Sequence, residues 1–173
     1  MPKIIDNLKD HIQKEAMRQI LTDGYSKTTI RSVARGCNIA VGTMYNYFSS
    51  KDELITSFML EDWRICVNKM TSIKTDDPEI FLREFHDALN EFVRKYESLF
   101  LDQDAQRVFA TVLSQRQVQF RKKLAGFIAC VSEKSSYEDK EFLAEHIAEN
   151  MVRWTMAGVP FEKQYSIINM LIK

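Results

Sequence analysis

Residues 42–48 read Gly-Thr-Met-Tyr-Asn-Tyr-Phe and bring hydroxyl and amide groups together without a carboxylate, a histidine or a cysteine. Such side chains recognise polar surfaces through hydrogen bonds, whereas acid-base and nucleophilic catalysis need groups that ionise near neutral pH. On a helix with ~100° between residues, two apolar side chains share one direction, namely Met44 and Phe48. Three small or polar residues point the opposite way: Gly42, Thr43 and Asn46. We therefore expect a short helix with a narrow polar face, edged by Tyr45 and Tyr47.

Such a face fits the major groove of DNA, which is ~12 Å wide. Gly42 would let the backbone approach closely, and Thr43 and Asn46 would reach base edges. The two tyrosine hydroxyls, together with Lys51, would meet backbone phosphates, which fix orientation but carry no sequence. A helical glycine costs roughly 1 kcal/mol relative to alanine, which favours this interpretation over ordinary packing.

A second short helix is expected directly before this one. Thr28 and Thr29 are its candidate N-caps and candidate DNA contacts. Arg31 and Ser32 fall in its first turn, where they can reach a phosphate or a guanine. With a tight connection at residues 37–39, the two helices form a helix-turn-helix, and a first helix packs across both.

Helices also account for the rest of the chain, so we expect an all-α fold. Apolar residues recur at three- and four-residue steps from Ile5 to Ile20, and Gly24 then ends the first helix. Residues 50–53 (Ser-Lys-Asp-Glu) have the form of a capping box, in which the glutamate carboxylate returns to the serine amide. A long fourth helix is predicted to begin there and to continue to Ile73.

A second bundle of helices is predicted after this long helix. Asp77 is its first N-cap, and Pro78 follows at the first helical position. The last two helices of the bundle are expected at residues 138–157 and 161–172. No strand pattern, internal repeat or low-complexity segment interrupts the series.

Charge is divided unevenly along the chain. The formal net charge of the 173 residues is zero, but residues 1–51 carry eight Lys or Arg and four Asp or Glu, a net of +4. This division is expected if only the first part meets an anion. The charged amino terminus and the lack of any run near ~20 apolar residues predict a cytoplasmic protein.

These residues resemble the DNA-binding segment of the tetracycline-repressor (TetR) family of transcriptional regulators, over about residues 5–58. The resemblance is carried by Gly24-Tyr25, Thr28-Thr29-Ile30-Arg31, Val33-Ala34, Ile39, Gly42-Thr43-Met44-Tyr45, Tyr47-Phe48, Lys51 and Leu54. It implies an N-terminal helix-turn-helix DNA-binding domain at residues 1–50 and a C-terminal helical domain for ligand binding and dimerisation at residues 51–173. It further implies a ligand-responsive repressor that binds a palindromic operator as a homodimer.

Two positions depart from the family pattern. Ala40 stands where the family commonly has Ser or Thr, and Val41 stands where a polar or basic residue is frequent. An alanine N-cap loses about 0.5–2 kcal/mol relative to a capping residue. Neither side chain can bind a phosphate, although Val41 can contact a thymine methyl group.

By the same resemblance, the dimer would form through the last two helices, with an apolar face supplied by Leu143, Ile147, Met151, Trp154 and Ile168. A pocket for a small, apolar effector would be lined by Trp63, Phe85, Phe92, Phe109, Phe127, Met151 and Trp154. Spacing alone favours a core position for each of these side chains.

Other classes of function find little support. No paired carboxylates, nucleophile with a base, or glycine-rich phosphate loop is evident, so we expect no enzymatic activity. Neither a cofactor nor a metal site is expected, since the three histidines and the three cysteines lack ligand-like spacing. The alternative is a protein-interaction adaptor that does not bind DNA by itself, which the two departures at Ala40 and Val41 favour.

Overall fold

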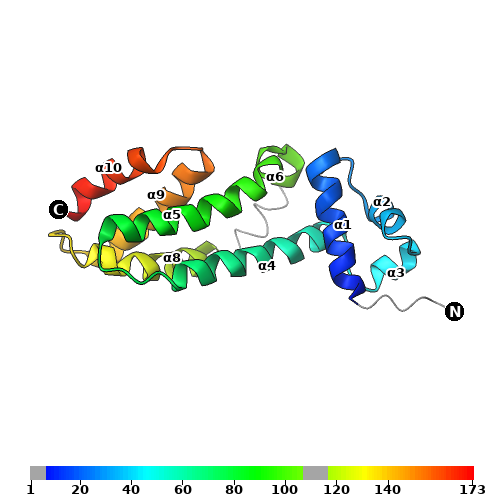
Figure 1. The fold of residues 1–173 in the computed structure, drawn as a ribbon, viewed down its shortest axis with the longest axis horizontal. Coiled ribbons are helices and arrows are strands. Elements are labelled where there is room, and N and C mark those ends of the chain that lie inside the picture. Colours follow the sequence, from blue (N-terminus) through cyan, green and yellow to red (C-terminus); the bar gives the residue numbers. More distant parts are fainter. Residues whose placement is uncertain (1–6, 107–116) are drawn as a thin grey trace. The chain divides into compact units, whose positions relative to one another are not determined.

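The structure is a computed structural model that describes residues 7–106 and 117–173. Every regular element within these ranges is a helix, which confirms the predicted all-α class. The helices shown in Figure 1 are α1 Leu8–Asp23, α2 Ile30–Gly36, α3 Val41–Tyr45, α4 Lys51–Thr71, α5 Pro78–Lys95, α6 Glu97–Leu101, α8 Gln117–Ser132, α9 Lys140–Met156 and α10 Phe161–Ile172. No helix in the described ranges has both the length and the apolar character that a membrane crossing demands.

The chain divides into two compact units. The first unit contains residues 1–62 and 97–110, and the second contains residues 63–96 and 111–173. Helix α4 supplies residues to both units. The functional division at residue 50 therefore stays a prediction, separate from this division by packing.

In the first unit, α1 and α3 both pack against α2. Helix α1 ends as predicted at Gly24, whose φ of 86° lies in the left-handed region and whose N–H donates to Ile20 O. Helices α1 to α4 and the turn after α3 supply the buried side chains of this unit: Ile12, Ala16, Ile20, Val33, Ala34, Met44, Phe48, Leu54, Ile55 and Phe58. This core fixes the outward faces of α2 and α3.

The start of α4 follows the predicted capping pattern only in part. The Glu53 N–H donates to Ser50 Oγ at 3.0 Å, as predicted. The Glu53 carboxylate, however, accepts hydrogen bonds from the N–H and the hydroxyl of Ser49, at 2.7 and 2.6 Å, and not from the Ser50 amide. Ser49 takes this place because it offers two donors to one carboxylate oxygen.

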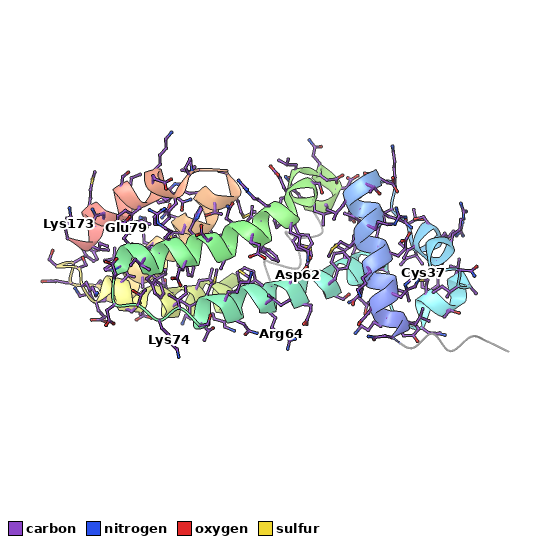
Figure 2. The ribbon with its side chains drawn as sticks, viewed as in Figure 1. Cys37, Asp62, Arg64, Lys74, Glu79 and Lys173 are labelled. Atoms are coloured by element: carbon purple, nitrogen blue, oxygen red, sulfur yellow. The ribbon has the colours of Figure 1, made fainter. Side chains whose placement is uncertain are left out.

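In the second unit, α9 packs most extensively on α8 and also contacts α5 and α10. Asp77 caps α5 as predicted, because its carboxylate accepts from the N–H groups of Glu79 and Ile80. The side chains of α5, α8 and α9 fill the space between these helices (Figure 2). The buried side chains include Phe81, Leu82, Phe85, Leu89, Leu124, Ile128, Val131, Leu143, Ile147, Met151 and Ile168.

This core corrects the apolar face that the sequence assigned to a dimer interface. Four of its five residues are at most 4% exposed within one chain, namely Leu143, Ile147, Met151 and Ile168, and Trp154 is half-buried. Their periodic spacing marks the faces of α9 and α10 that pack inside the second unit. A different set of apolar side chains is exposed from residue 137 onward: Tyr137, Phe142, Met156, Ile167, Met170 and Leu171.

Candidate nucleic-acid interface

Helix α3 and the turn after it present the polar face that the helical wheel predicts. Met44 is 0% and Phe48 2% exposed, so these two side chains anchor the segment in the core. Asn46 follows the last residue of α3 but keeps a helical backbone, with φ −71° and ψ −19°. The outward residues, which we call the α3 strip, are Gly42, Thr43, Tyr45, Asn46 and Tyr47.

Within the α3 strip, every residue except Thr43 is exposed. Gly42 and Asn46 are exposed and Thr43 is half-buried. Tyr45 and Tyr47 are 57% and 41% exposed. A strip with small or short polar groups in the middle and phenol hydroxyls at its margins has the shape and hydrogen-bonding groups for a DNA groove.

The start of α3 is unusual for the lack of a polar cap. Ala40 occupies the N-cap position with extended backbone, and no side chain caps the helix there. Val41 is half-buried. The first turn of α3 therefore presents methyl groups, as the sequence predicts.

Three predicted contact residues at the start of α2, namely Thr28, Thr29 and Ser32, have different surroundings. Thr29 is the N-cap, and it exchanges hydrogen bonds with Ser32: the Ser32 N–H donates to Thr29 Oγ1, and the Thr29 N–H donates to Ser32 Oγ. Thr28, in contrast, is 1% exposed, and its hydroxyl donates to Gly24 O at 2.9 Å. The Thr28 side chain therefore holds the loop before α2 and is not available to DNA in this conformation.

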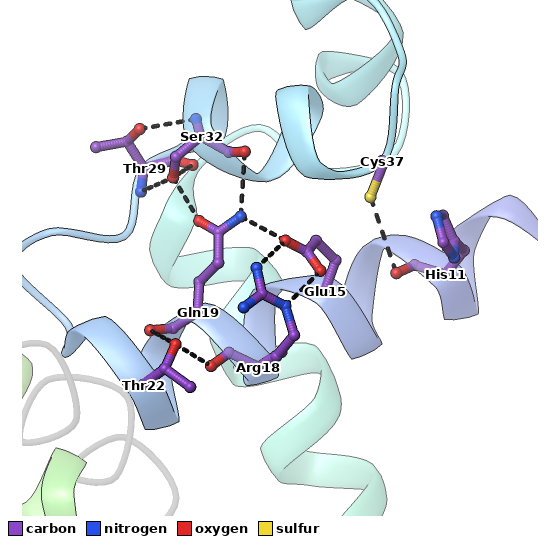
Figure 3. A network of polar contacts seen from close by, with 8 residues as sticks. All are labelled: His11, Glu15, Arg18, Gln19, Thr22, Thr29, Ser32 and Cys37. Carbon is purple, nitrogen blue, oxygen red and sulfur yellow. Dashed lines mark hydrogen bonds and ion pairs between the residues drawn. The ribbon is translucent and has the colours of Figure 1, made fainter.

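A polar network joins α1 to α2 (Figure 3). The Gln19 amide donates to Glu15 Oε1 at 2.7 Å and to Ser32 O at 3.1 Å, and its oxygen accepts from the Ser32 hydroxyl at 2.6 Å. Arg18 donates to both oxygens of Glu15, at 2.9 and 2.7 Å. Gln19 is 6% exposed, so the two helices are held by hydrogen bonds that water scarcely reaches.

The same network lowers the pKa of the Glu15 carboxyl from 4.5 to about 2. Hydrogen bonds from Arg18 are the largest cause; burial opposes them, and Gln19 adds to the lowering. A side chain at Gly36 would collide with this carboxylate, because its Cβ would lie 2.2 Å from Glu15 Oε1. Glycine at the end of α2 thus permits the close approach of Glu15.

Lys51 is less free than the sequence suggests. Its Nζ donates to Tyr25 O at 3.0 Å and lies 3.5 Å from the centre of the Tyr25 ring. Burial lowers the pKa of the Lys51 ammonium, although neighbouring aspartates, first of them Asp52, raise it. The ammonium is already held by the loop that contains Tyr25, which argues against the phosphate contact predicted for Lys51, although that contact stays a prediction.

Arg31 is exposed on α2, and no described residue forms an ion pair or hydrogen bond with its guanidinium. Arg35, one helical turn later, has the same surroundings. Sequence analysis missed Arg35, although the four-residue spacing from Arg31 places both on one face of the helix.

The residues predicted to line an effector pocket do not share one environment. Phe85 and Met151 are 0% exposed and belong to the core, and Phe109 lies outside the described residues. The other four are half-buried: Trp63, Phe92, Phe127 and Trp154. Among these, Trp63 and Phe92 meet edge to face with ring centres 5.2 Å apart.

The second unit has an open hollow of about 600 Å³ between the Ser135–Asp139 segment and the end of α10. It includes none of the seven predicted residues. Among the described residues, no group of three or more His, Cys, Asp or Glu is placed to hold a metal ion.

Comparison with known proteins agrees with this geometry. Residues 12–57 match the family model described as bacterial regulatory proteins, tetR family. By this match, residues 12–57 are a segment of the tetR-family type. The matched segment contains the α1–α2 network, the α3 strip and the start of α4.

Curated relatives match the chain only in part. The transcriptional repressor KstR of Rhodococcus jostii is 35% identical over 66 residues, which cover 34% of this chain and 31% of the relative. The transcriptional regulator HbdR of an Aromatoleum species is 32% identical over 54 residues, which cover 31% of this chain and 24% of the relative. The matches thus span about a third or less of the relatives.

Solved structures match the whole fold at low identity. The fatty acid degradation regulator FadR of Bacillus halodurans has a TM-score of 0.62 at 18% identity and covers 98% of this chain and 97% of its own. A TetR transcription regulator of Haloarcula marismortui has a TM-score of 0.68 at 18% identity, with 97% of each chain covered. At this identity the likeness establishes the tetR-family fold.

Proposed function

We propose that the protein is a DNA-binding transcriptional regulator and acts as a ligand-responsive repressor. The observation that carries the proposal is the α3 strip, in which buried Met44 and Phe48 turn Thr43 and Asn46 outward. In the complex, Thr43 and Asn46 read base edges, and Tyr45 and Tyr47 contact flanking phosphates. A regulator of this kind works where chromosomal DNA lies, which places the protein in the cytoplasm.

The proposed assembly is a homodimer that binds a palindromic operator. Regulators of the tetR family bind operators and dimerise. One head makes few phosphate contacts, whereas two heads spaced by whole turns of DNA read two half-sites together. The exposed apolar residues of α9 and α10 support a dimer through these two helices, with Ile167 and Met170 48% and 77% exposed.

The proposed effector is a small, apolar molecule bound in the second unit. The half-buried aromatic side chains of Trp63, Phe92, Phe127 and Trp154 support this site. They can form contacts with a ligand while the fully buried side chains of the core stay in place. The chain has two tryptophans, Trp63 and Trp154, and both belong to the second unit. Their fluorescence therefore reports directly on ligand binding there.

Selection from random duplex DNA tests the proposal. The purified protein is incubated with the random pool, bound duplexes are sequenced, and the elution volume is measured on the same sample. We expect a two-fold symmetric consensus, a dimeric elution volume and an affinity that falls as salt is added, because binding releases counterions from phosphates. A protein with no salt-dependent affinity for any duplex would instead be the protein-interaction adaptor.

A further inference from the structure

The two arginines of α2 form a charged pair that has no ion pair or hydrogen bond with any described residue. Arg31 and Arg35 lie four residues apart, which puts their Cβ atoms about 5–6 Å from each other on one helix face. Like charges at this spacing destabilise a helix slightly. Glu15 of α1 approaches the end of α2 at Gly36, and its carboxylate is held by Arg18 and Gln19.

These arginines line an open hollow of about 570 Å³ between α2 and α3. Its other walls are uncharged: Ala34, Asn38, Ile39, Ala40 and Val41. No acidic residue lines the hollow. Two guanidinium groups beside an uncharged wall attract an anion and provide the paired N–H donors that suit phosphate oxygens.

The α3 side of the hollow explains why α2 must supply the charge. Ala40 and Val41 form that wall, and neither carries a donor. Among the lining residues, a phosphate placed against the start of α3 would therefore find positive charge only on α2, with the Asn38 amide as an uncharged donor. The exposed α3 strip begins at Gly42, directly after this wall, so an anion in the hollow would lie beside the base-reading residues.

We propose that Arg35, together with Arg31, binds a backbone phosphate of operator DNA in this hollow and replaces the donors missing at positions 40 and 41. The inference rests on the proposed DNA binding and assigns it a residue outside α3. A phosphate contact fixes orientation and strengthens binding to all sequences alike. Arg35 thus contributes to affinity for DNA of any sequence, whereas residues of the α3 strip read the bases.

Binding isotherms for Arg35→Ala test this assignment, on the duplex selected by the wild-type protein and on a scrambled duplex of equal length. We expect about a tenfold loss on both duplexes. The slope of log K against log salt should become less negative by about 0.9 per head, the contribution of one phosphate contact. Arg35→Lys should keep the slope. Arg94→Ala removes an exposed arginine from α5 in the second unit and should leave both quantities unchanged.

Compensation provides the sharper test. Val41→Lys in the Arg35→Ala background places a cation on the opposite wall of the same hollow and should restore most of the salt slope. An unchanged slope in Arg35→Ala, with wild-type binding still dependent on salt, overturns the phosphate contact and leaves the proposed function standing. A loss confined to the selected duplex would make Arg35 a base-reading residue and also overturn it.

Two further outcomes are informative. One distinguishes a free phosphate from a DNA phosphate, and the other distinguishes failure of the Arg35 contact from failure of the proposed DNA binding. Saturable binding of inorganic phosphate to the DNA-free protein, abolished by Arg35→Ala, would assign the hollow to a free anion and overturn the DNA contact. Absence of salt-dependent DNA binding in the wild-type protein would refute the proposed function itself.

Discussion

The Tyr25 hydroxyl donates a hydrogen bond to the Asp52 carboxylate at 2.6 Å and so ties the loop before α2 to the first turn of α4. Tyr25 is 6% exposed, and burial, followed by this hydrogen bond, raises the pKa of its hydroxyl. Lys51 holds the same loop through Tyr25 O. Two neighbouring residues of α4 thus fix the segment from which α2 begins.

Tyr25→Phe should lower the free energy of unfolding by about 1–2 kcal/mol, because a buried hydrogen bond to a charged group is lost. Urea unfolding at neutral pH measures the change. Tyr45→Phe is the matched control, since the exposed Tyr45 hydroxyl has no described partner, and it should change stability by less than about 0.5 kcal/mol. Equal effects of the two substitutions would contradict a structural role for the Tyr25 hydroxyl.

Lys51→Ala should weaken DNA binding on matched and scrambled duplexes alike without changing the salt slope. The reason is that the ammonium supports the Tyr25 loop, so its removal loosens α2 but removes no phosphate contact. Stability should also fall, by about 1 kcal/mol. Isotherms at several salt concentrations measure this, and a slope less negative by about 1 would restore the direct phosphate contact predicted from the sequence.

Glu15→Gln should make the stability of the protein less sensitive to acid. The pKa of Glu15 is lowered from 4.5 to about 2, so its carboxylate contributes fully above about pH 4.5 and loses that contribution as the pH falls toward about 2. The wild-type protein should therefore be more stable than the variant at neutral pH, and the difference should shrink across that range. Thermal unfolding of both proteins measures it; parallel curves down to pH 2 would count against the Arg18 and Gln19 contacts.

Ile167→Glu should shift the protein from dimer to monomer, because it places a charge among the exposed apolar side chains of α10. Ile80→Glu on α5 is a close control, since Ile80 is 49% exposed and Ile167 is 48% exposed. Elution volume measured over a range of protein concentrations compares the two variants. A shift in both variants, or in neither, would argue against a dimer through α9 and α10.

The sequence predicts the helix caps and the α3 strip well because their signals are local. The caps at Asp77 and Gly24 depend on neighbouring residues, and the wheel for residues 42–48 needs only helical geometry. Faces that depend on tertiary packing could not be predicted in this way. Leu143 and Ile147 have the spacing of any buried stripe, and periodicity does not say whether another helix of the same chain or a second chain covers it.

Lys51 and Thr28 show the same limit at the scale of one side chain. Both are polar residues beside a recognition helix, yet one is held by Tyr25 O and the other is buried against Gly24 O. Those partners are backbone carbonyl groups, which carry no sequence signal. Arg35, by contrast, could have been found from its spacing to Arg31.

Asn46→Ala should change which base is preferred more than it changes overall affinity. The Asn46 amide is exposed on the α3 strip, between the phenol groups of Tyr45 and Tyr47, and a carboxamide can form paired hydrogen bonds with an adenine edge. Losing such a pair costs about 1–3 kcal/mol of discrimination at one position of each half-site. Tyr47→Phe removes only a hydroxyl assigned to phosphate and should weaken binding to every duplex equally. Isotherms on the selected duplex, on single-base variants of it and on a scrambled duplex compare the two; an equal loss on all of them from Asn46→Ala would mean that Asn46 does not read a base.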